Sequence, residues 1–407
     1  MVKNLWRRML AVGASLAVMG TMVWAIGIGG AAAPAGASGA PLKVLFACTC
    51  SGATAVQAVG KGAIQAWQDA TNAAGGVNGH KIDVIYDDDT GNPGLALSQV
   101  EKAITNDGVV AIIDNTGLDT DWITYAAAHG VPVISQGDSQ TATTSEDFFN
   151  VGETLDEYFT NFIDLAKKYG AKDLGEMYCA ESPVCLQAVA PLKATGAAMH
   201  FPITFTEEVS SSAPNYTAQC LAAKQAGVDV ISTATAPVVA EHIASDCATQ
   251  NYHPYFIGLD GAVATGFATA PGLGNKFIGS EPDIPFFVTN TPATEAYQAA
   301  LKKYEPGVEK APTYSESEVQ LWLSGQLILA AAKAGKVDTN GAAGAKQLVN
   351  GLYSLHGETL GGMAPPLTFS RTKPHVVDCW YWISANGKTF TTPFGLTANC
   401  VKPTPLS

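Results

Sequence analysis

The sequence predicts an α/β fold made of open parallel β-sheets in two domains. Short apolar runs alternate with stretches whose apolar residues recur at helical spacing, and this alternation is typical of βαβ units with right-handed crossovers. The chain has 407 residues, enough for two domains of ordinary size after an N-terminal leader is set aside. With 47% hydrophobic and 14% charged residues, its composition is that of a well-packed globular protein.

The first part of the chain shows the alternation clearly. Leu42–Ala47 is a compact apolar run suited to a buried parallel strand. The helical spacing of Ala53–Ala74 ends at Gly75-Gly76, a helix-capping signal, and a second strand is predicted at Lys81–Tyr86. Asp87–Asn92 is predicted to be a polar turn. Its three aspartates lack the spacing of an EF-hand loop, which favours a solvated turn over a calcium site.

The same alternation continues into the second half of the chain. Strands are predicted at Val109–Ile113, Val131–Ser135, Leu174–Tyr178, Ile203–Phe205, Val228–Thr233 and Tyr255–Leu259. Helices are predicted at Leu95–Asn106, Trp122–His129, Phe159–Tyr169, Thr294–Tyr304, Ser315–Ala334 and Ala343–Leu352. The tail, Leu367–Pro393, is predicted to be a β-hairpin that turns at Asn386-Gly387.

Residues 1–37 are predicted to be a secretory signal peptide. Lys3, Arg7 and Arg8 precede an apolar run from Met9 to about Ile28, and a small-residue tract with Ala-x-Ala cleavage sites follows. Two alternatives stay open. The apolar run approaches the length of a retained membrane anchor, and the four residues ending at Cys48 faintly resemble a lipoprotein signal. All three imply export, so we expect a periplasmic, cell-surface or secreted protein.

The charge of the chain limits the partners that it can be expected to bind. The chain has 36 acidic and 23 basic side chains, a formal net charge of −13, and no basic cluster, which argues against nucleic acid and anionic lipid as partners.

An even set of eight cysteines in an exported chain indicates disulfides. Sequence neighbours predict the bridges Cys179–Cys185, Cys220–Cys247 and Cys379–Cys400, and leave Cys48 and Cys50 as a short bridge or two free thiols. The spacings match no zinc pattern, so we expect no metal and no cofactor.

Several motifs occur in an order that points to one family. They are Ala73–Ile82 (AAGGVNGHKI), Tyr86-Asp87-Asp88 with Pro93 and Ala96, Gly130–Ser135 (GVPVIS) and Asn386-Gly387-Lys388. Together they resemble type I periplasmic binding proteins of the branched-chain amino acid family, over most of the chain after the leader. The Ala73–Ile82 segment is the most specific of them.

The resemblance implies a solute-binding protein that serves an ABC permease and ATPase. It implies two Rossmann-like α/β lobes joined by three hinge crossings, lobe one being 41–153 with 287–360 and lobe two 154–286 with 361–407. We expect a monomer that holds a small polar solute between its lobes. Independently, ligands of open α/β sheets bind beyond the carboxyl ends of the strands, where helix N-termini offer free N–H groups. Hinge closure would then bury the solute.

The predicted ligand-binding residues lie mostly just after strands. They are Ser51, Gly52, Asn115, Thr116, Gly137, Asp138, Ser139, Tyr158, Thr235, Asp260 and Tyr314. By resemblance, Asn115 and Thr116 stand where the family often has a Ser-rich loop that donates to a ligand carboxylate. Other roles remain open: a helix cap for Ser51, a turn for Asn115 and Thr116, and core packing for the two tyrosines.

Two acids bear on the kind of solute. Asp138 stands where amino acid binders of the family usually carry Ala in a Gly-Ala-Thr sequence, and an acid there would repel a carboxylate unless it points to solvent. Asp260 stands where the family places an acid against the ligand ammonium, although an Asx turn would also explain it. Two acids without a convincing Arg or Lys favour a neutral or cationic solute, such as an amide, amine, polyol or amino acid.

Motifs of catalysis are absent from the sequence. There is no G-x-S-x-G and no H-E-x-x-H, the Gly52–Gly62 segment has the wrong spacing for a P-loop, and the seven histidines are scattered. The sequence therefore predicts a binding protein and not an enzyme. Two alternatives remain: a ligand-sensing receptor domain of the same fold and a secreted α/β hydrolase.

Overall fold

The computed structural model describes most of the chain beyond the leader. The described residues are 37–51, 60–136, 139–152, 155–181, 183–258, 263–311, 313–373, 375 and 377–400. The predicted leader, apart from Ala37, lies outside them. No helix in the described part of the chain combines the length and the apolar character needed to cross a membrane.

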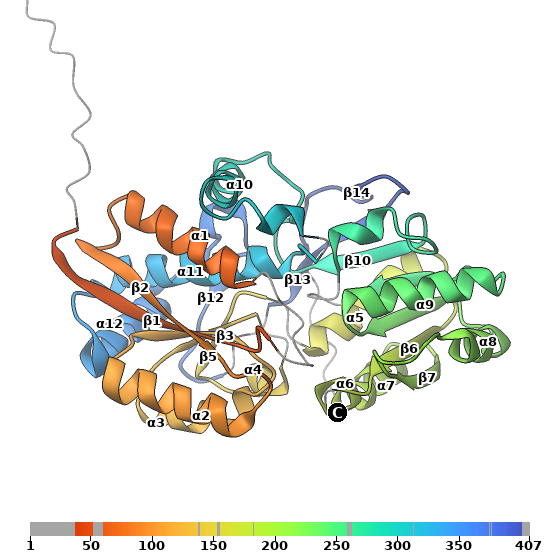
Figure 1. Cartoon of the computed structure of the whole chain (residues 1–407), viewed down its shortest axis with the longest axis horizontal. Coiled ribbons are helices and arrows are strands. Elements are labelled where there is room, and N and C mark those ends of the chain that lie inside the picture. Colours follow the sequence, from red (N-terminus) through yellow and green to blue (C-terminus); the bar gives the residue numbers. More distant parts are fainter. Residues whose placement is uncertain are drawn as a thin grey trace, which may run out of the picture. The chain divides into compact units, whose positions relative to one another are not determined.

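A five-stranded parallel sheet, sheet A, forms from the first part of the chain (Figure 1). Its strands are β1 (Gly39–Cys48), β2 (His80–Asp88), β3 (Ala111–Asn115), β4 (Val133–Ser135) and β5 (Phe148–Asn150). They stand in the order β2-β1-β3-β4-β5, and all four pairings are parallel. The interior strand β1 is apolar on both faces, because helices cover both faces of the sheet.

Helices from two distant parts of the sequence cover sheet A. They are α1 (Gly60–Ala73), α2 (Pro93–Lys102), α3 (Ile123–Ala128), α4 (Gln140–Thr144), α10 (Pro292–Tyr304), α11 (Ser317–Gly335) and α12 (Gly341–Ser354). Phe46 of β1 packs in the cluster that holds Trp67 of α1, and its neighbour Leu45 packs on the other face with Trp122. The helices α1 and α11 approach closely at Gly325, where a Cβ atom would lie 2.3 Å from the Trp67 ring.

Sheet B forms from the rest of the chain. Its strands are β6 (Leu174–Cys179), β7 (Ile203–Val209), β8 (Val230–Ala234), β9 (Tyr255–Gly258), β10 (Phe277–Glu281), β13 (Cys379–Ala385), β14 (Phe390–Thr391) and β15 (Asn399–Cys400). Its helices are α5 (Leu155–Lys168), α6 (Pro183–Gln187), α7 (Val189–Ala198), α8 (Thr217–Ala226) and α9 (Pro237–Thr249). A separate ribbon pairs β11 (His356–Glu358) with β12 (Leu367–Thr368).

The two sheets repeat one strand order. The parallel part of sheet B runs β7-β6-β8-β9-β10, and the antiparallel β13 follows at β10. Counted from its own first strand, each sheet therefore has the order 2-1-3-4-5. In such sheets the order reverses between the first and third strands, and the loops after those two strands flank the usual ligand site.

The structure departs from the sequence-based elements in a few places. The short strands β5 and β10 were not predicted. The predicted polar turn at Asp87–Asn92 is wrong at its start, because Asp87 and Asp88 belong to β2 and Asp89 is only 2% exposed. The tail hairpin is present as β13 and β14, with Gly387 at φ 84° in its turn. The three predicted disulfides form, and Cys48 and Cys50, which the sequence left as a short bridge or two free thiols, are also bonded.

A carboxyl group in the core of sheet B makes stability depend on pH. Glu176 of β6 is 2% exposed, and burial raises its pKa to about 7, although the Ser232 hydroxyl on β8 partly offsets this. The folded protein therefore holds this proton more tightly than the unfolded chain does. The stabilisation is complete below about pH 4.5, the unfolded pKa, and is lost as the pH rises through about 7.

We expect the substitution Glu176→Gln to remove this dependence. Above pH 7 the variant should be more stable than the wild type by up to about 3 kcal/mol, because a shift of one pKa unit corresponds to about 1.4 kcal/mol. Urea unfolding of both proteins between pH 4.5 and 8.5 measures the difference. His375, whose pKa burial lowers to about 4, gives stability an opposite dependence on pH, but both proteins share it and it cancels. A constant difference between them across this range would contradict the assignment.

Candidate functional site

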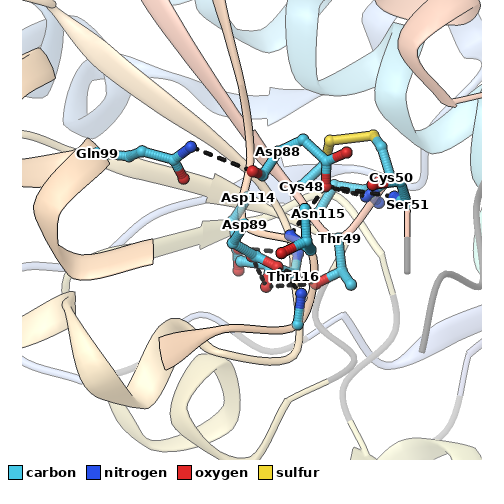
Figure 2. The surroundings of a disulfide bond; sticks show 12 residues. Cys48, Thr49, Cys50, Ser51, Asp88, Asp89, Gln99, Asp114, Asn115 and Thr116 are labelled. Carbon is cyan, nitrogen blue, oxygen red and sulfur yellow. Dashed lines mark hydrogen bonds between the residues drawn. A yellow bond between two sulfur atoms is a disulfide. The ribbon is translucent and has the colours of Figure 1, made fainter. Parts of the chain in front are cut away.

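The candidate site begins at the carboxyl ends of β1 and β3, the reversal point of sheet A. Figure 2 shows the residues there. The Thr49 hydroxyl, just after β1, donates to Oδ1 of Asp89 at 2.8 Å, and the Thr116 hydroxyl, just after β3, donates to Oδ2 at 2.6 Å. The Gly91 amide donates to Oδ1 at 2.8 Å. One buried carboxylate thus joins the ends of three adjacent strands.

A disulfide shapes the loop that leaves β1. Cys48, the last residue of β1, is bonded to Cys50 (Figure 2). The backbone amides of Cys50 and Ser51 donate to Oδ1 of Asp88, at 3.1 Å and 3.3 Å, and the Thr90 amide donates to the same atom. Burial opposes ionisation of Asp88, but hydrogen bonds from Ser51, Thr90 and Cys50 hold its pKa below the usual range. A charged carboxylate therefore fixes this loop.

Side-chain amides connect the next strand ends of sheet A. Asn115 at the end of β3 donates through Nδ2 to Oε1 of Gln136, which follows β4, at 3.1 Å. Gln136 in turn donates through Nε2 to the carbonyl oxygen of Ser317, the first residue of α11, at 3.0 Å. A residue some 180 positions away in sequence therefore anchors the carboxyl end of β4.

Sheet B has a similar arrangement at its own reversal point, between β6 and β8. Cys179, the last residue of β6, is bonded to Cys185, so in each sheet a disulfide lies in the loop after the first strand. In this loop Glu181 accepts hydrogen bonds from the Ser211 amide at 2.6 Å and from the hydroxyls of Ser210 and Ser211. Burial opposes ionisation of Glu181, but these bonds hold its pKa below the usual range. Thr235 follows β8 across the reversal point.

The structure places the predicted residues in different settings. Ser51, Thr116 and Thr235 lie in the loops at the two reversal points, and Asn115 is the last residue of β3. Ser139 caps α4, accepting from the Ala142 amide at 2.9 Å, and its hydroxyl donates to Asp119. Burial raises the pKa of Asp119 to about 6, and the Ser139 bond limits the rise.

The two predicted tyrosines lie in the hydrophobic cores. Tyr158 packs under sheet B with Phe162, and Tyr314 shares a hydrogen bond with the Tyr297 hydroxyl at 3.1 Å. The predicted site residues Gly52, Gly137, Asp138 and Asp260 lie outside the described residues. Their role as ligand contacts stays a prediction.

Sequence reasoning missed the roles of Thr49, Asp89, Gln136 and Glu181. Thr49 stands between the two closely spaced cysteines, and that spacing was a signal that the loop is constrained. Asp89 was assigned to solvent because nothing in its neighbourhood in sequence shows that β1 and β3 end beside it. For Gln136 and Glu181 we find no local signal, since their partners Ser317 and Ser211 are 181 and 30 positions away.

Two surface hollows of the protein lie away from the carboxyl ends of the strands. They have volumes of about 330 Å³ and about 310 Å³ and lie at the opposite ends of the strands. Pro132 and Asp147, which precede β4 and β5, line the first, and Asp229 and Pro254, which precede β8 and β9, line the second. Within the described residues, no three His, Cys, Asp or Glu side chains are grouped closely enough to hold a metal ion.

Comparison with known sequences matches the chain to one family. The model of a protein family described as "Periplasmic binding protein" matches residues 41–389. A Leu/Ile/Val-binding protein homologue from Brucella abortus (strain 2308) is 27% identical over 207 residues. That match covers 49% of this chain and spans 55%, about half, of the length of the relative.

Solved structures of the same architecture cover nearly all of the described chain. One is a solute-binding protein of an ABC transporter from R. palustris in complex with benzoate, with TM-score 0.70 and 19% identity, covering 89% of this chain and 98% of that one. Another is a branched-chain amino acid transporter substrate-binding protein from Streptococcus pneumoniae in complex with isoleucine. It has TM-score 0.66 and 19% identity, with 89% of this chain and 100% of that chain covered.

Proposed function

Because the chain belongs to the periplasmic binding protein family, we propose that it is the extracytoplasmic solute-binding component of an ABC importer. Its task would be to capture a small polar solute outside the cytoplasm and to present it to a permease that works with an ATPase. The family is one of binding proteins, so catalysis by a secreted hydrolase is set aside.

The observation that carries this proposal is the repeated reversal point. Both sheets have the order 2-1-3-4-5, and in both the loop after the first strand is closed by a disulfide. We call the reversal point of each sheet a half-site. Two half-sites of similar structure would allow the protein to contact a ligand on two of its faces. Hydroxyls and ordered backbone N–H groups lie in the loops at both reversal points, and side-chain amides lie at that of sheet A, which suits a polar solute.

The proposed mechanism is hinge closure between two discontinuous lobes, 41–153 with 287–360 and 154–286 with 361–407. A solute that contacts both half-sites stabilises the closed form by its own binding free energy. A compound that contacts only one half-site should leave the equilibrium between open and closed forms unchanged. The closed form would be the one that the permease recognises, and the binding protein would act as a monomer.

A thermal-shift screen of the exported chain, from Ser38 with its disulfides intact, tests the proposal. The compounds are amino acids, amides, polyamines, sugars and aromatic acids, including isoleucine and benzoate. A ligand at 100 times its dissociation constant adds about 2.7 kcal/mol to the free energy of unfolding, so a hit raises the melting temperature clearly. A folded sample that responds to no compound in any class would argue against solute binding.

Replacing Thr235 by Val tests the half-site of sheet B. Among the described residues, the Thr235 hydroxyl is bonded only to the Ala236 carbonyl, at a long 3.4 Å, so the fold should tolerate the change. We expect the ligand-induced rise in melting temperature to shrink in this variant. Thr120→Val, at an exposed threonine, is the matched control and should keep the full response. Equal responses in the two variants would remove Thr235 from the site.

A further inference from the structure

The Asp89 carboxylate, at the reversal point of sheet A, determines which of the groups around it donate hydrogen bonds and which accept them. Three oxygen pairs are in contact: Thr49 with Asp89 at 2.8 Å, Thr116 with Asp89 at 2.6 Å, and Thr49 with Thr116 at 2.9 Å. A carboxylate only accepts, so the three contacts share the two hydroxyl protons of the threonines. One contact therefore has no proton of its own.

The contact without a proton is the one between the two threonines. Bonds from a hydroxyl to a carboxylate are about twice as strong as bonds between neutral groups, so both protons go to Asp89. The alternative, a bond from Thr49 to Thr116, would place a bare hydroxyl oxygen 2.8 Å from Oδ1 of Asp89. The Gly91 amide also donates to Oδ1, and the Leu118 amide donates to the Thr116 hydroxyl oxygen at 3.1 Å.

Each threonine oxygen consequently keeps acceptor capacity but no free proton, although the Leu118 amide takes one lone pair of Thr116. The two oxygens lie 2.9 Å apart, with both protons engaged by Asp89. Thr49 and Thr116 each keep 8% of their surface exposed, whereas Asp89 keeps 2%. A single donor, such as an ammonium or amide N–H, can bridge two acceptor oxygens at this spacing. A carboxylate at the same point would meet lone pairs and no proton.

We propose that Asp89 is a specificity-determining positioning residue that makes the reversal point of sheet A accept hydrogen bonds and discriminate against carboxylates. This inference rests on the proposed solute-binding function and adds the class of the solute: a donor-bearing group, such as a carboxamide or an amine, occupies the end of the site between β1 and β3. It differs from the sequence-based expectation that Thr116 donates to a ligand carboxylate.

Neutron diffraction from a deuterium-exchanged crystal of the ligand-free protein directly tests the direction of the hydrogen bonds between the two threonines and Asp89. We expect deuterons on the hydroxyl oxygens of Thr49 and Thr116, both directed at Asp89. A deuteron on Asp89, or either hydroxyl deuteron directed away from it, would overturn the proposal. This measurement needs no knowledge of the solute.

Calorimetry with matched pairs of compounds tests the discrimination. The pairs are benzamide with benzoate and isoleucinamide with isoleucine, which differ by one amide nitrogen in place of one oxygen. We expect the wild type to prefer the amide member by about tenfold or more, because the charged carboxylate of the acid member would go without a hydrogen bond at this point. A wild type that prefers the acid in both pairs would contradict the inference.

The substitution Asp89→Asn should reverse the polarity, because the Asn side chain can donate to one threonine oxygen and release that hydroxyl proton toward the ligand. The preference for the amide should fall by about tenfold. Asp83→Asn, at an exposed position of β2, removes the same charge and should keep the wild-type ratio. An equal fall in both variants would show a general charge effect and overturn the assignment. If no compound of any class binds the wild type, the proposed function is wrong. The neutron map still decides whether both threonine hydroxyls donate to Asp89.

Discussion

A Gly152→Ala protein is expected to lose at least about 3 kcal/mol of folding free energy, at the upper end of what overpacking costs. Gly152 follows β5 on the way to α5, and a Cβ atom there would lie 1.7 Å from the carbonyl oxygen of Gln136. It would also lie 2.6 Å from Nε2 of Gln320. The Gln136 carbonyl is backbone and cannot turn aside, because the Val151 amide donates to Ser135 beside it at 3.0 Å. The strand ends of β4 and β5 would have to separate.

Urea unfolding compares this variant with a control at another glycine. Gly307 has φ −82° and no atom within 4 Å of an added Cβ, so Gly307→Ala should stay within about 0.5 kcal/mol of the wild type. We expect Gly152→Ala also to weaken ligand binding, since Gln136 and Asn115 would shift with the strand end. Equal unfolding midpoints for the two variants would show that the contact at Gly152 is not as close as described.

Removing the Cys220–Cys247 disulfide is the second change with a large expected effect. The bridge joins α8 to α9 across 27 positions, and both cysteines are fully buried. From the entropy of closing a loop of that length, the double variant Cys220→Ala/Cys247→Ala should lose about 3.5 kcal/mol of folding free energy. The cavity left by two sulfur atoms adds to this loss.

The Cys179–Cys185 bridge provides a comparison in the same sheet. It closes a loop of only 6 positions, and the same relation gives a loss of about 2.2 kcal/mol for Cys179→Ala/Cys185→Ala. Chemical denaturation of both double variants measures the two losses. The longer loop should lose more, and a larger loss for the shorter one would contradict the loop-entropy account. Because Cys179 ends β6 at the reversal point, its variant should weaken solute binding more than the Cys220 variant does.

Much of the fold could be read from the sequence because the signals are local. The apolar run at Leu42–Ala47 must be a buried strand whichever strands lie beside it, and Gly75-Gly76 ends its helix whichever face the helix covers. The tail hairpin turned where Asn386-Gly387 predicted. The short strands β5 and β10 were missed because each holds only two large apolar residues, followed by Asn150 in β5 and by Gly279, Ser280 and Glu281 in β10.

In the candidate site, too, local properties could be predicted from the sequence and non-local ones could not. Position after a strand is a local property, so Ser51, Asn115, Thr116 and Thr235 could be named from the sequence. Direction of hydrogen bonding is not local. Whether Thr116 offers a proton or a lone pair depends on Asp89, 27 positions earlier, and on Thr49, 67 positions earlier.

The sequence by itself determined the alternation of strands and helices, three of the four cysteine pairs and the family resemblance, since each depends on neighbours along the chain. The tertiary structure decided the strand order, and with it the meeting of β1, β2 and β3 at Asp89. It also decided that this aspartate is buried and binds two hydroxyl protons, where its sequence neighbours Asp87 and Asp88 had indicated a solvated turn. The physical reason is that a buried carboxylate must find donors, and those donors come from whichever strand ends the fold brings beside it.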